Sequence, residues 1–310
     1  MDWIDPVGRR LKLRDLHILM VVAQIGSMAR AAKQLAISQP VVSRTIADLE
    51  RTLGVRLLDR TPQGVTPTIF GRALLKRSLV VFDELRQSVR ELEFLADPDV
   101  GEVRAGCSEY MAAGLIPAVI DRLSKRHPQL LFQFELGDAA SQLRERKVEF
   151  VIARLLSRDL DEDIDSEVLF HEPVFIAAGT GSKWATRRKI ALRELADERW
   201  MLAPLELTEG SPLVEAFRAE GLPLPEARVL GYSLPLRNGL LATGRFLTMV
   251  PGSVLRFGAE RLLLKPLPVK LPKWQLPVAI LTLKHRTLSP VAQLFIDCAR
   301  EIAGPMAKAD

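Results

Sequence analysis

Three helical patterns fill the first 67 residues of the chain. The apolar face of the first helix, which Gly26 ends, consists of Leu16, Leu19, Met20 and Ala23. Ser27 is placed to cap a second helix, whose apolar positions are Met28, Ala31, Ala32 and Leu35. A third helix follows Ser38 and ends at Gly54, with an apolar face made of Val42, Ile46, Leu49 and Leu53. Pro40 falls in the first turn of this helix, where its missing N–H is harmless.

One long helix is predicted next, because the stretch from Arg72 to Asp97 contains neither Gly nor Pro. Its positions at alternating spacings of four and three are Leu74, Ser78, Val81, Leu85, Ser88, Leu92 and Leu95, flanked by the row Leu75, Phe82 and Val89. A heptad-like seam of this kind is typical of helices that pack lengthwise against another helix. We expect Val81, Leu85, Leu92 and Leu95 to pair with the same helix of a second chain. Packing against the body of the same chain is the alternative.

From Gly101 onward, segments with strand and helix patterns alternate. The first set comprises strands at 103–107, 130–136 and 150–153 with helices at 114–126 and 140–147. A similar set follows at 174–178, 200–203, 211–220, 228–231, 234–242 and 246–250, and a strand at 278–284 and a helix at 290–302 close the chain. This alternation predicts mostly parallel sheets in two small α/β lobes. The last strand and helix are expected to return to the first lobe, with crossings near residues 171–173 and 271–277.

These patterns divide the chain into three predicted parts. Residues 1–67 form a small helical domain, and residues 68–97 form a linker helix that also dimerises. Residues 98–310 form an α/β body, with one lobe at about 98–171 and 277–310 and the other at about 172–276.

Composition narrows the class of protein. The 310 residues are 48% hydrophobic and 26% charged, as in an ordinary soluble globular protein. The apolar run from Leu16 to Gly26 is too short to span a bilayer, and no signal-peptide pattern precedes it, so we expect no membrane and a cytoplasmic location. The two cysteines and four histidines show no metal-ligand spacing, and neither a metal nor another cofactor is expected.

The charge is distributed unevenly along the chain. Residues 1–77 carry a net charge of +7, and the remaining residues carry −2. Such an asymmetry favours a basic module for a polyanion joined to a near-neutral body. A merely solvated basic face is the alternative.

The second and third helices, joined by a tight turn, fit a helix-turn-helix. The exposed face of the third helix then carries Gln39, Pro40, Ser43, Arg44 and Thr45. Arg44 suits a bidentate contact to guanine, Gln39 an adenine or a phosphate, and Pro40 a thymine methyl group. Ser27, Ser43 and Thr45 suit phosphates or base edges. Taken alone, the pattern also allows a small helical bundle with a polar surface.

At these residues the sequence resembles the LysR-type transcriptional regulators. The resemblance rests on Ala31, Ala32, Leu35, the run Ser38-Gln39-Pro40-x-Val42-Ser43-Arg44, then Asp48, Leu49, Glu50, Leu53, Gly54, Leu57, Leu58, Arg60, Val65, Thr66, Pro67, Thr68 and Gly71. It implies a winged helix-turn-helix in which Ser38 joins the DNA-binding residues and Arg60 lies near the minor groove. It also implies a two-lobed α/β effector domain of periplasmic-binding-protein type, and usually a tetramer.

Two positions depart from the family pattern. The family often has Asn or Gly where Ala36 stands in the turn, and Phe where Leu58 stands. We interpret both as packing substitutions that leave the DNA-binding face unchanged.

The candidate effector site follows from the α/β pattern, because ligands of open sheets bind beyond the carboxyl ends of the strands. The residues expected there are Ser108, Tyr110, Asp138, Arg154, Thr208, Gly210 and Ser211. Arg154 suits a carboxylate or phosphate. Asp138 would repel an anion unless it binds a hydroxyl, so the effector chemistry stays open. Cys107, at a strand end, is interpreted as a buried structural thiol, with redox sensing as the alternative.

Together these features predict a transcriptional regulator that binds double-stranded promoter DNA and responds to a small-molecule effector. It is expected to be a homo-oligomer, either dimer or tetramer, with RNA polymerase as a candidate further partner. An α/β enzyme is disfavoured because no Gly-rich phosphate loop, Gly-x-Ser-x-Gly elbow or metal cluster is present, and no catalytic residue is expected. A solute-binding protein of a transport system would leave the basic N-terminal module without a role.

Overall fold

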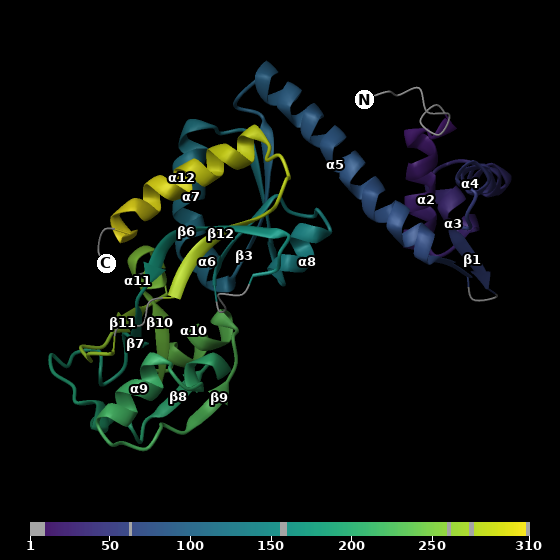
Figure 1. The fold of residues 1–310 in the computed structure, drawn as a ribbon. Helices are drawn as coiled ribbons and strands as arrows, with labels where there is room; N and C mark the ends of the chain where they lie inside the picture. The colour runs from purple at the N-terminus through teal and green to yellow at the C-terminus, as the bar shows by residue number, and fades with distance from the viewer. Residues whose placement is uncertain (1–9, 62–63, 156–159, 259–261, 273–275, 308–310) are drawn as a thin grey trace. The chain divides into compact units, whose positions relative to one another are not determined.

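The computed structural model describes residues 10–61, 64–155, 160–258, 262–272 and 276–307. It contains two compact units, residues 1–89 and 90–310, which are described separately below. The first unit is drawn in purple to blue in Figure 1 and the second in blue to yellow. No helix in the described part of the chain is long and apolar enough to cross a membrane.

In the part of the first unit that the structure describes, three helices and a hairpin precede the long helix α5 (Ile69–Ala96). The elements are α2 (Leu13–Ile25), α3 (Met28–Gln34), α4 (Gln39–Leu53), β1 (Leu58–Thr61) and β2 (Gly64–Pro67). Gly26 and Gly54 end α2 and α4 in the left-handed conformation that glycine favours. The Ser27 hydroxyl accepts a hydrogen bond from Arg30 N and caps α3. The predicted helices are therefore present with the predicted caps at Ser27 and both glycines.

The buried face of α2 differs from the predicted one. Among the predicted residues of the first helix only Leu19 is fully buried, and Ile18, Val21 and Val22 complete the buried face of α2. The first helix is apolar on most sides, so periodicity alone could not choose its inner face. The predicted core positions of the other two helices are buried or packed against the core.

The turn between α3 and α4 shows that the interpretation of Ala36 as a packing substitution was wrong. Ala36 is exposed and has a φ of +52°, so its position makes a demand on the backbone rather than on packing. Asn and Gly tolerate this left-handed conformation better than Ala does. Leu58, by contrast, is buried in the core, as a packing substitution should be.

The long helix α5 (Ile69–Ala96) starts three residues earlier than predicted, and its 28 residues span about 42 Å at 1.5 Å per residue. Thr68 caps it by accepting from Gly71 N at 3.0 Å. Leu74 and Leu75 pack on the core of the first unit, and Phe82 contacts the His17 ring.

The second unit is built on two five-stranded sheets, flanked by helices (Figure 1). The first sheet has the order β4-β3-β5-β12-β6, with bounds β3 (Gly101–Cys107), β4 (Leu130–Leu136), β5 (Phe150–Arg154), β6 (Ile164–Glu172) and β12 (Leu276–Leu283). The second has the order β11-β7-β10-β8-β9, with bounds β7 (Val174–Gly179), β8 (Arg199–Leu202), β9 (Ala227–Leu230), β10 (Phe246–Pro251) and β11 (Leu264–Pro266).

Helices cover these sheets and carry several of the residues considered below. Those of the first sheet are α6 (Glu109–Ala113), α7 (Leu115–Arg126), α8 (Ala139–Arg144) and α12 (Pro290–Ala307), and α12 packs against α7, β6 and β3. The others are η1 (Leu192–Leu195), η2 (Pro204–Leu207), α9 (Pro212–Ala219), α10 (Leu234–Ala242) and α11 (Gly252–Gly258).

Both sheets are mixed, so the prediction of mostly parallel sheets was wrong. In the first sheet β12 runs antiparallel to β5 and β6, and in the second β7 runs antiparallel to β10 and β11. The chain passes from β6 to β7 through the single residue Pro173, and β12 brings it back to the first sheet. Part of the other expected crossing, residues 273–275, lies outside the described residues.

Candidate functional site

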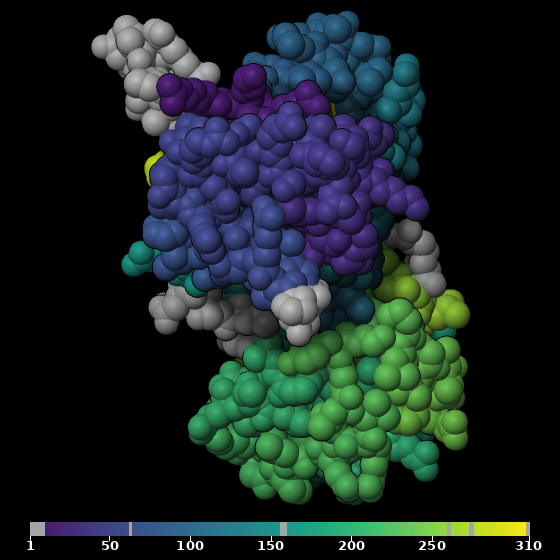
Figure 2. Space-filling model, turned by 90° about the vertical axis from the view of Figure 1, so that its right-hand side faces the viewer, coloured from purple at the N-terminus to yellow at the C-terminus, as the bar shows by residue number. Residues whose placement is uncertain are grey.

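One face of α4 is held in the core and the opposite face is open to solvent. Val42, Ile46 and Leu49 are buried, whereas Ser38, Gln39, Pro40 and Arg44 are exposed and Ser43 and Thr45 are half-buried. Arg44 forms no ion pair with any described residue. Figure 2 views the purple-to-blue surface of the unit to which α4 belongs. The exposed face therefore presents a free guanidinium with amide and hydroxyl groups around it.

The hairpin that follows α4 carries another predicted DNA contact, Arg60. Arg60 is exposed on β1 and stands opposite Val65 of β2 in an antiparallel register. The backbone N–H of Val65 donates to the Gly26 carbonyl at 2.9 Å, which fastens β2 to the end of α2. The hairpin is thus held to the helices as a wing, with Arg60 projecting from it.

The seam of α5 is exposed within the chain. Val81 and Leu85 are 41% and 43% exposed, and Leu92 and Leu95 reach 67% and 72%. Large apolar side chains that lie together in solvent are typical of surfaces that contact a partner, so these four make a candidate contact surface. Ser78, on the same seam, is instead buried and donates its hydroxyl to the Leu74 carbonyl at 2.9 Å.

A cavity of about 420 Å³ lies at the carboxyl ends of β3 and β5. Ser108, Tyr110 and Arg154 line it from the first-sheet side, and Leu205 and Tyr232 line it from the segments of the second sheet. Three of the predicted effector residues, Ser108, Tyr110 and Arg154, are therefore brought together at one cavity.

The other four predicted effector residues do not line this cavity. Asp138 is exposed and caps α8 by accepting from Ser141 N at 2.7 Å. Ser211 is buried and caps α9, accepting from Val214 N and donating to the Glu206 carbonyl. Thr208 donates to the Leu205 carbonyl, and Gly210 occupies an exposed turn with a φ of +82°. In this structure these residues shape the loops beside the cavity, and their contact with an effector stays a prediction.

Two guanidinium groups flank the aromatic ring of Tyr110. The Cζ atom of Arg154 lies 4.1 Å from the ring centroid, and that of Arg237 lies 5.6 Å from it. Burial raises the pKa of the Tyr110 hydroxyl, against the opposing effect of the two arginines. Such cation–π contacts hold a guanidinium in place while leaving its N–H groups free to donate.

Two buried carboxyl groups lie near these arginines. Burial raises the pKa of Glu206, although Arg237 and the Ala203 N–H act in the opposite direction. Burial also raises the pKa of Glu172. This effect is partly offset by hydrogen bonding to Ser253, whose backbone N–H donates to Glu172 at 3.1 Å, and by the charge of Arg154. Both side chains therefore favour the neutral form more than a solvated carboxyl does.

Glu206 and Arg237 are not among the residues predicted from the sequence. Arg237 is 1% exposed and donates from Nη1 to the Met249 carbonyl at 2.5 Å and to Glu206 at 3.4 Å. The signal was visible, because Arg237 stands with Leu234 and Leu241 on the buried face of α10. A charged residue on an apolar helical face indicates a buried polar function.

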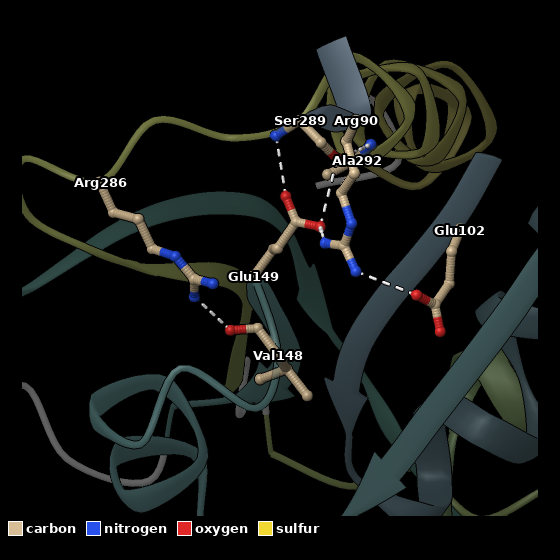
Figure 3. A network of polar contacts seen from close by, with 7 residues as sticks. All are labelled: Arg90, Glu102, Val148, Glu149, Arg286, Ser289 and Ala292. Carbon is tan, nitrogen blue, oxygen red and sulfur yellow. Dashed lines mark hydrogen bonds and ion pairs between the residues drawn. The ribbon is translucent and has the colours of Figure 1, made fainter. Parts of the chain in front are cut away.

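Within the second unit, an ion-pair network holds the last turns of α5 (Figure 3). Arg90 donates to Glu149 at 2.8 Å and to Glu102 at 2.9 Å. Glu149 is 1% exposed and also accepts from the backbone N–H of Ser289 at 2.8 Å and from the Ser289 hydroxyl. Since Glu149 directly precedes β5, the strand that ends at Arg154, one short strand joins this network to the cavity.

Cys107 lies at the cavity edge and is nearly inaccessible. Burial raises its pKa to about 11, so the group is a thiol at neutral pH. Within the described residues no group of three or more His, Cys, Asp or Glu side chains is arranged to hold a metal ion.

Comparisons with protein families match both parts of the chain. Residues 13–72 match the model described as "Bacterial regulatory helix-turn-helix protein, lysR family", and residues 96–304 match the "LysR substrate binding domain". The HTH-type transcriptional regulator GbpR of Azospirillum brasilense is 28% identical, covering 94% of this chain and 86% of its own length. TdcA of Escherichia coli is 26% identical over 94% of this chain and 93% of its own length.

Solved structures share the fold over nearly the whole chain. A full-length OxyR variant from Pseudomonas aeruginosa matches with a TM-score of 0.60 at 21% identity, covering 94% of each chain. CbnR in complex with its target DNA matches with a TM-score of 0.52 at 21% identity, covering 94% of this chain and 100% of its own.

Proposed function

The chain belongs to the LysR family of bacterial transcriptional regulators, and on this premise we propose that α4 reads duplex DNA while the cavity at Arg154 receives the controlling small molecule. The observation that carries the proposal is that one chain has both features. Arg44 is exposed and forms no ion pair with a described residue, and a cavity is lined by three of the expected effector residues. The protein acts by binding and is not an enzyme. It works where promoter DNA is accessible, in the cytoplasm.

The DNA contacts are divided between the helix and the wing. Gln39, Pro40 and Arg44 are assigned to base edges, because they are exposed in the first turns of α4. Ser27, Ser38, Ser43 and Thr45 are assigned to phosphates or base edges, and Arg60 to the minor groove. The net charge of +7 on residues 1–77 supports the assignment, since it adds a sequence-independent attraction to phosphates.

The exposed seam of α5 is assigned to dimerisation. Val81, Leu85, Leu92 and Leu95 pair with the same helix of a second chain, which brings two copies of α4 to two half-sites of a promoter. A tetramer formed by two such dimers is the assembly proposed for the full regulator. RNA polymerase is the proposed further partner at an activated promoter.

The cavity is assigned to the effector. A ligand changes DNA binding only if it binds one arrangement of the protein more tightly than another. Arg154 is suited to this role because it stands at the end of β5, whose first end adjoins Glu149 and hence the anchor of α5. Binding at one end of the strand is thereby linked to the linker helix at the other.

The DNA-binding proposal is tested by measuring fluorescence anisotropy of a labelled promoter duplex with the full chain at increasing salt. The expected result is a steep linear fall of log affinity with log salt, with tighter binding to the promoter than to a scrambled duplex. Equal affinity for promoter and scrambled duplexes at every salt concentration would contradict sequence-specific recognition by α4.

A further inference from the structure

The guanidinium of Arg154 has no carboxylate partner in the part of the chain that the structure describes. No described carboxylate lies within ion-pair distance of it, and its position is set by the Tyr110 ring, 4.1 Å from Cζ. Its side chain lines both the 420 Å³ cavity and a small pit of about 20 Å³ beside Glu206. An arginine that is held in place and has free N–H groups at a cavity can bind two oxygens of a carboxylate or phosphate.

A second unpartnered group lies on the same wall. The hydroxyl of Ser108 is buried and has no hydrogen-bond partner among the described residues. Ser108 and Arg154 both line the cavity, from the ends of β3 and β5. A buried hydroxyl without a partner costs free energy, so a bound acceptor at this place would relieve it.

The nearby carboxyl groups do not replace that anion. Glu109 lines the same cavity, but its Oε2 already accepts from the Leu234 backbone N–H at 2.6 Å. Glu206 is bonded to Ala203 N at 2.7 Å and to Arg237, and Glu172 to Ser253 N. Glu172 Oε2 has no hydrogen-bond partner among the described residues, and the charge of Arg154 opposes the effect of burial on the pKa of both carboxyls. Neither of these two carboxyls forms an ion pair with Arg154, so its N–H groups stay available to a ligand.

The rest of the cavity is mainly apolar. Its walls include Cys107, Leu136, Leu205 and Tyr232, which offer hydrocarbon and ring surface rather than further charged donors. The volume of about 420 Å³ falls in the lower part of the range for small-molecule pockets. A second anionic group on the ligand would lie against these apolar walls or near Glu109.

We propose that the effector is a small monocarboxylate with an apolar body, whose carboxylate binds Arg154 and Ser108 and whose body packs against Leu136, Leu205 and Tyr232. This inference rests on the proposed function, because it assigns the chemistry of the proposed effector cavity. The Arg154 guanidinium and the Ser108 hydroxyl, beside the Tyr110 hydroxyl that also lacks a partner among the described residues, can together hold the two oxygens of one carboxylate. An ammonium is disfavoured because Arg154 faces the cavity.

A matched set of ring compounds tests the assignment on the full chain. Thermal unfolding is recorded with phenylacetate, its neutral amide phenylacetamide, the cation phenethylamine and the zwitterion phenylalanine, because a ligand of the folded state raises Tm. The expected result is a rise in Tm with phenylacetate alone. In Arg154→Gln, the affinity for phenylacetate should fall about 10- to 100-fold, as for a lost hydrogen-bonded charge.

The controls separate the chemistry from the fold and from the site. Arg193→Gln, which removes an exposed arginine on η1, should keep the wild-type response. The Tm of Arg154→Gln without ligand should match that of wild type, which shows that the variant folds. Ser108→Ala should weaken phenylacetate binding without abolishing it.

Two kinds of outcome would overturn the proposal. A Tm rise with phenylacetamide or phenylalanine equal to that with phenylacetate, or no rise with phenylacetate or hexanoate, would show that the class is wrong. If phenylacetamide binds and Leu205→Trp abolishes its binding, the cavity is still the effector site, but the effector is not required to be a carboxylate. Ligand binding that neither Arg154→Gln nor Leu205→Trp changes would lie elsewhere and would count against the proposed function of the cavity itself.

Discussion

Arg90 of α5 and the buried Glu149 form an ion pair with 2.8 Å between Nη1 and Oε1. Their side chains are 11% and 1% exposed, so the pair is shielded from water on both sides. Arg90→Met removes the cation and leaves the Glu149 carboxylate buried with only the Ser289 donors. We expect the loss of about 3–5 kcal/mol in the free energy of unfolding that follows when one partner of a buried pair is removed. Urea denaturation monitored by tryptophan fluorescence measures it.

Arg300→Met is the matched control for this prediction. Arg300 pairs with Glu167 and Asp297 at the surface, where its side chain is 41% exposed. Exposed pairs contribute about 1 kcal/mol or less. An equal loss in both variants would mean that the burial of Glu149 does not set the strength of the Arg90 contact.

The second prediction concerns the exposed face of α4. Arg44→Ala should weaken binding to the target promoter by about 1–3 kcal/mol and relax discrimination at one base pair. Arg51→Ala is the control, because Arg51 lies in the last turn of the same helix and is paired with Asp48 at 2.5 Å. Anisotropy titrations with promoter and scrambled duplexes give both affinities. If Arg44→Ala binds the promoter as tightly as wild type, the recognition face is assigned wrongly.

The third prediction concerns the seam of α5. Replacing Leu85 and Leu92 together by Glu puts charges on side chains that are 43% and 67% exposed in the single chain. In a single chain the new carboxylates stay solvated and should be tolerated. In a dimer the seam would bury them without partners, which should prevent association. We expect monomers in sedimentation velocity and weak DNA binding. Arg86→Glu, an exposed change on the same helix, should leave the oligomer intact. A double variant that stays oligomeric through these helices would refute the seam.

Local patterns predicted the three helices of the N-terminal unit and where they end. Ser27, Gly26 and Gly54 act within a few residues of their positions, so capping chemistry marks the helix ends directly. Ala36 shows the limit, because its exposure and left-handed φ depend on the path of the turn and were interpreted as packing. The inner face of α2 likewise depends on what packs against it.

The sheet order of the second unit depends on long-range pairing that no local pattern contains. β6 was missed because it lies at the sheet edge, pairs only with β12 and is largely polar on its open side. The alternation of strands and helices indicated α/β lobes, but it did not reveal that β7 and β12 run antiparallel to their neighbours in the sheets. At the cavity, Arg154 was found because it ends an apolar strand. Glu206 was missed because it comes from a short turn in η2 that only tertiary packing buries.

The fourth prediction concerns Cys107. Burial raises its pKa to about 11, which leaves about one thiolate per thousand molecules at pH 8. Iodoacetamide should therefore modify the native protein very slowly at this residue and the urea-unfolded protein rapidly, as peptide mass spectrometry would show. Rapid modification of Cys107 in the native state would instead support redox sensing. Labelling of Cys298, which is also buried, provides the internal comparison.

The last prediction concerns pH and Glu206. Burial raises the pKa of this carboxyl in the folded state, whereas in the unfolded chain it titrates near its usual value of about 4.3. Between these two pKa values the folded state binds more protons, so the contribution of Glu206 to stability declines as pH rises and is constant above the folded-state pKa. Glu206→Gln cannot titrate. Its stability relative to wild type should therefore increase as pH is raised from 4.5 and then level off.

Glu194→Gln separates the cap from the titration. Glu194 accepts from Ala191 N at 2.7 Å as Glu206 accepts from Ala203 N at 2.7 Å, but Glu194 lies at the surface. The replacement of a carboxylate acceptor by an amide acceptor at the cap is common to both variants and cancels in the comparison. Glu172 cancels because every variant retains it. Urea denaturation at half-unit steps between pH 4.5 and 8 gives the difference curves. A Glu206→Gln curve that is flat, or that falls as pH rises, would show that burial does not hold this carboxyl toward its neutral form.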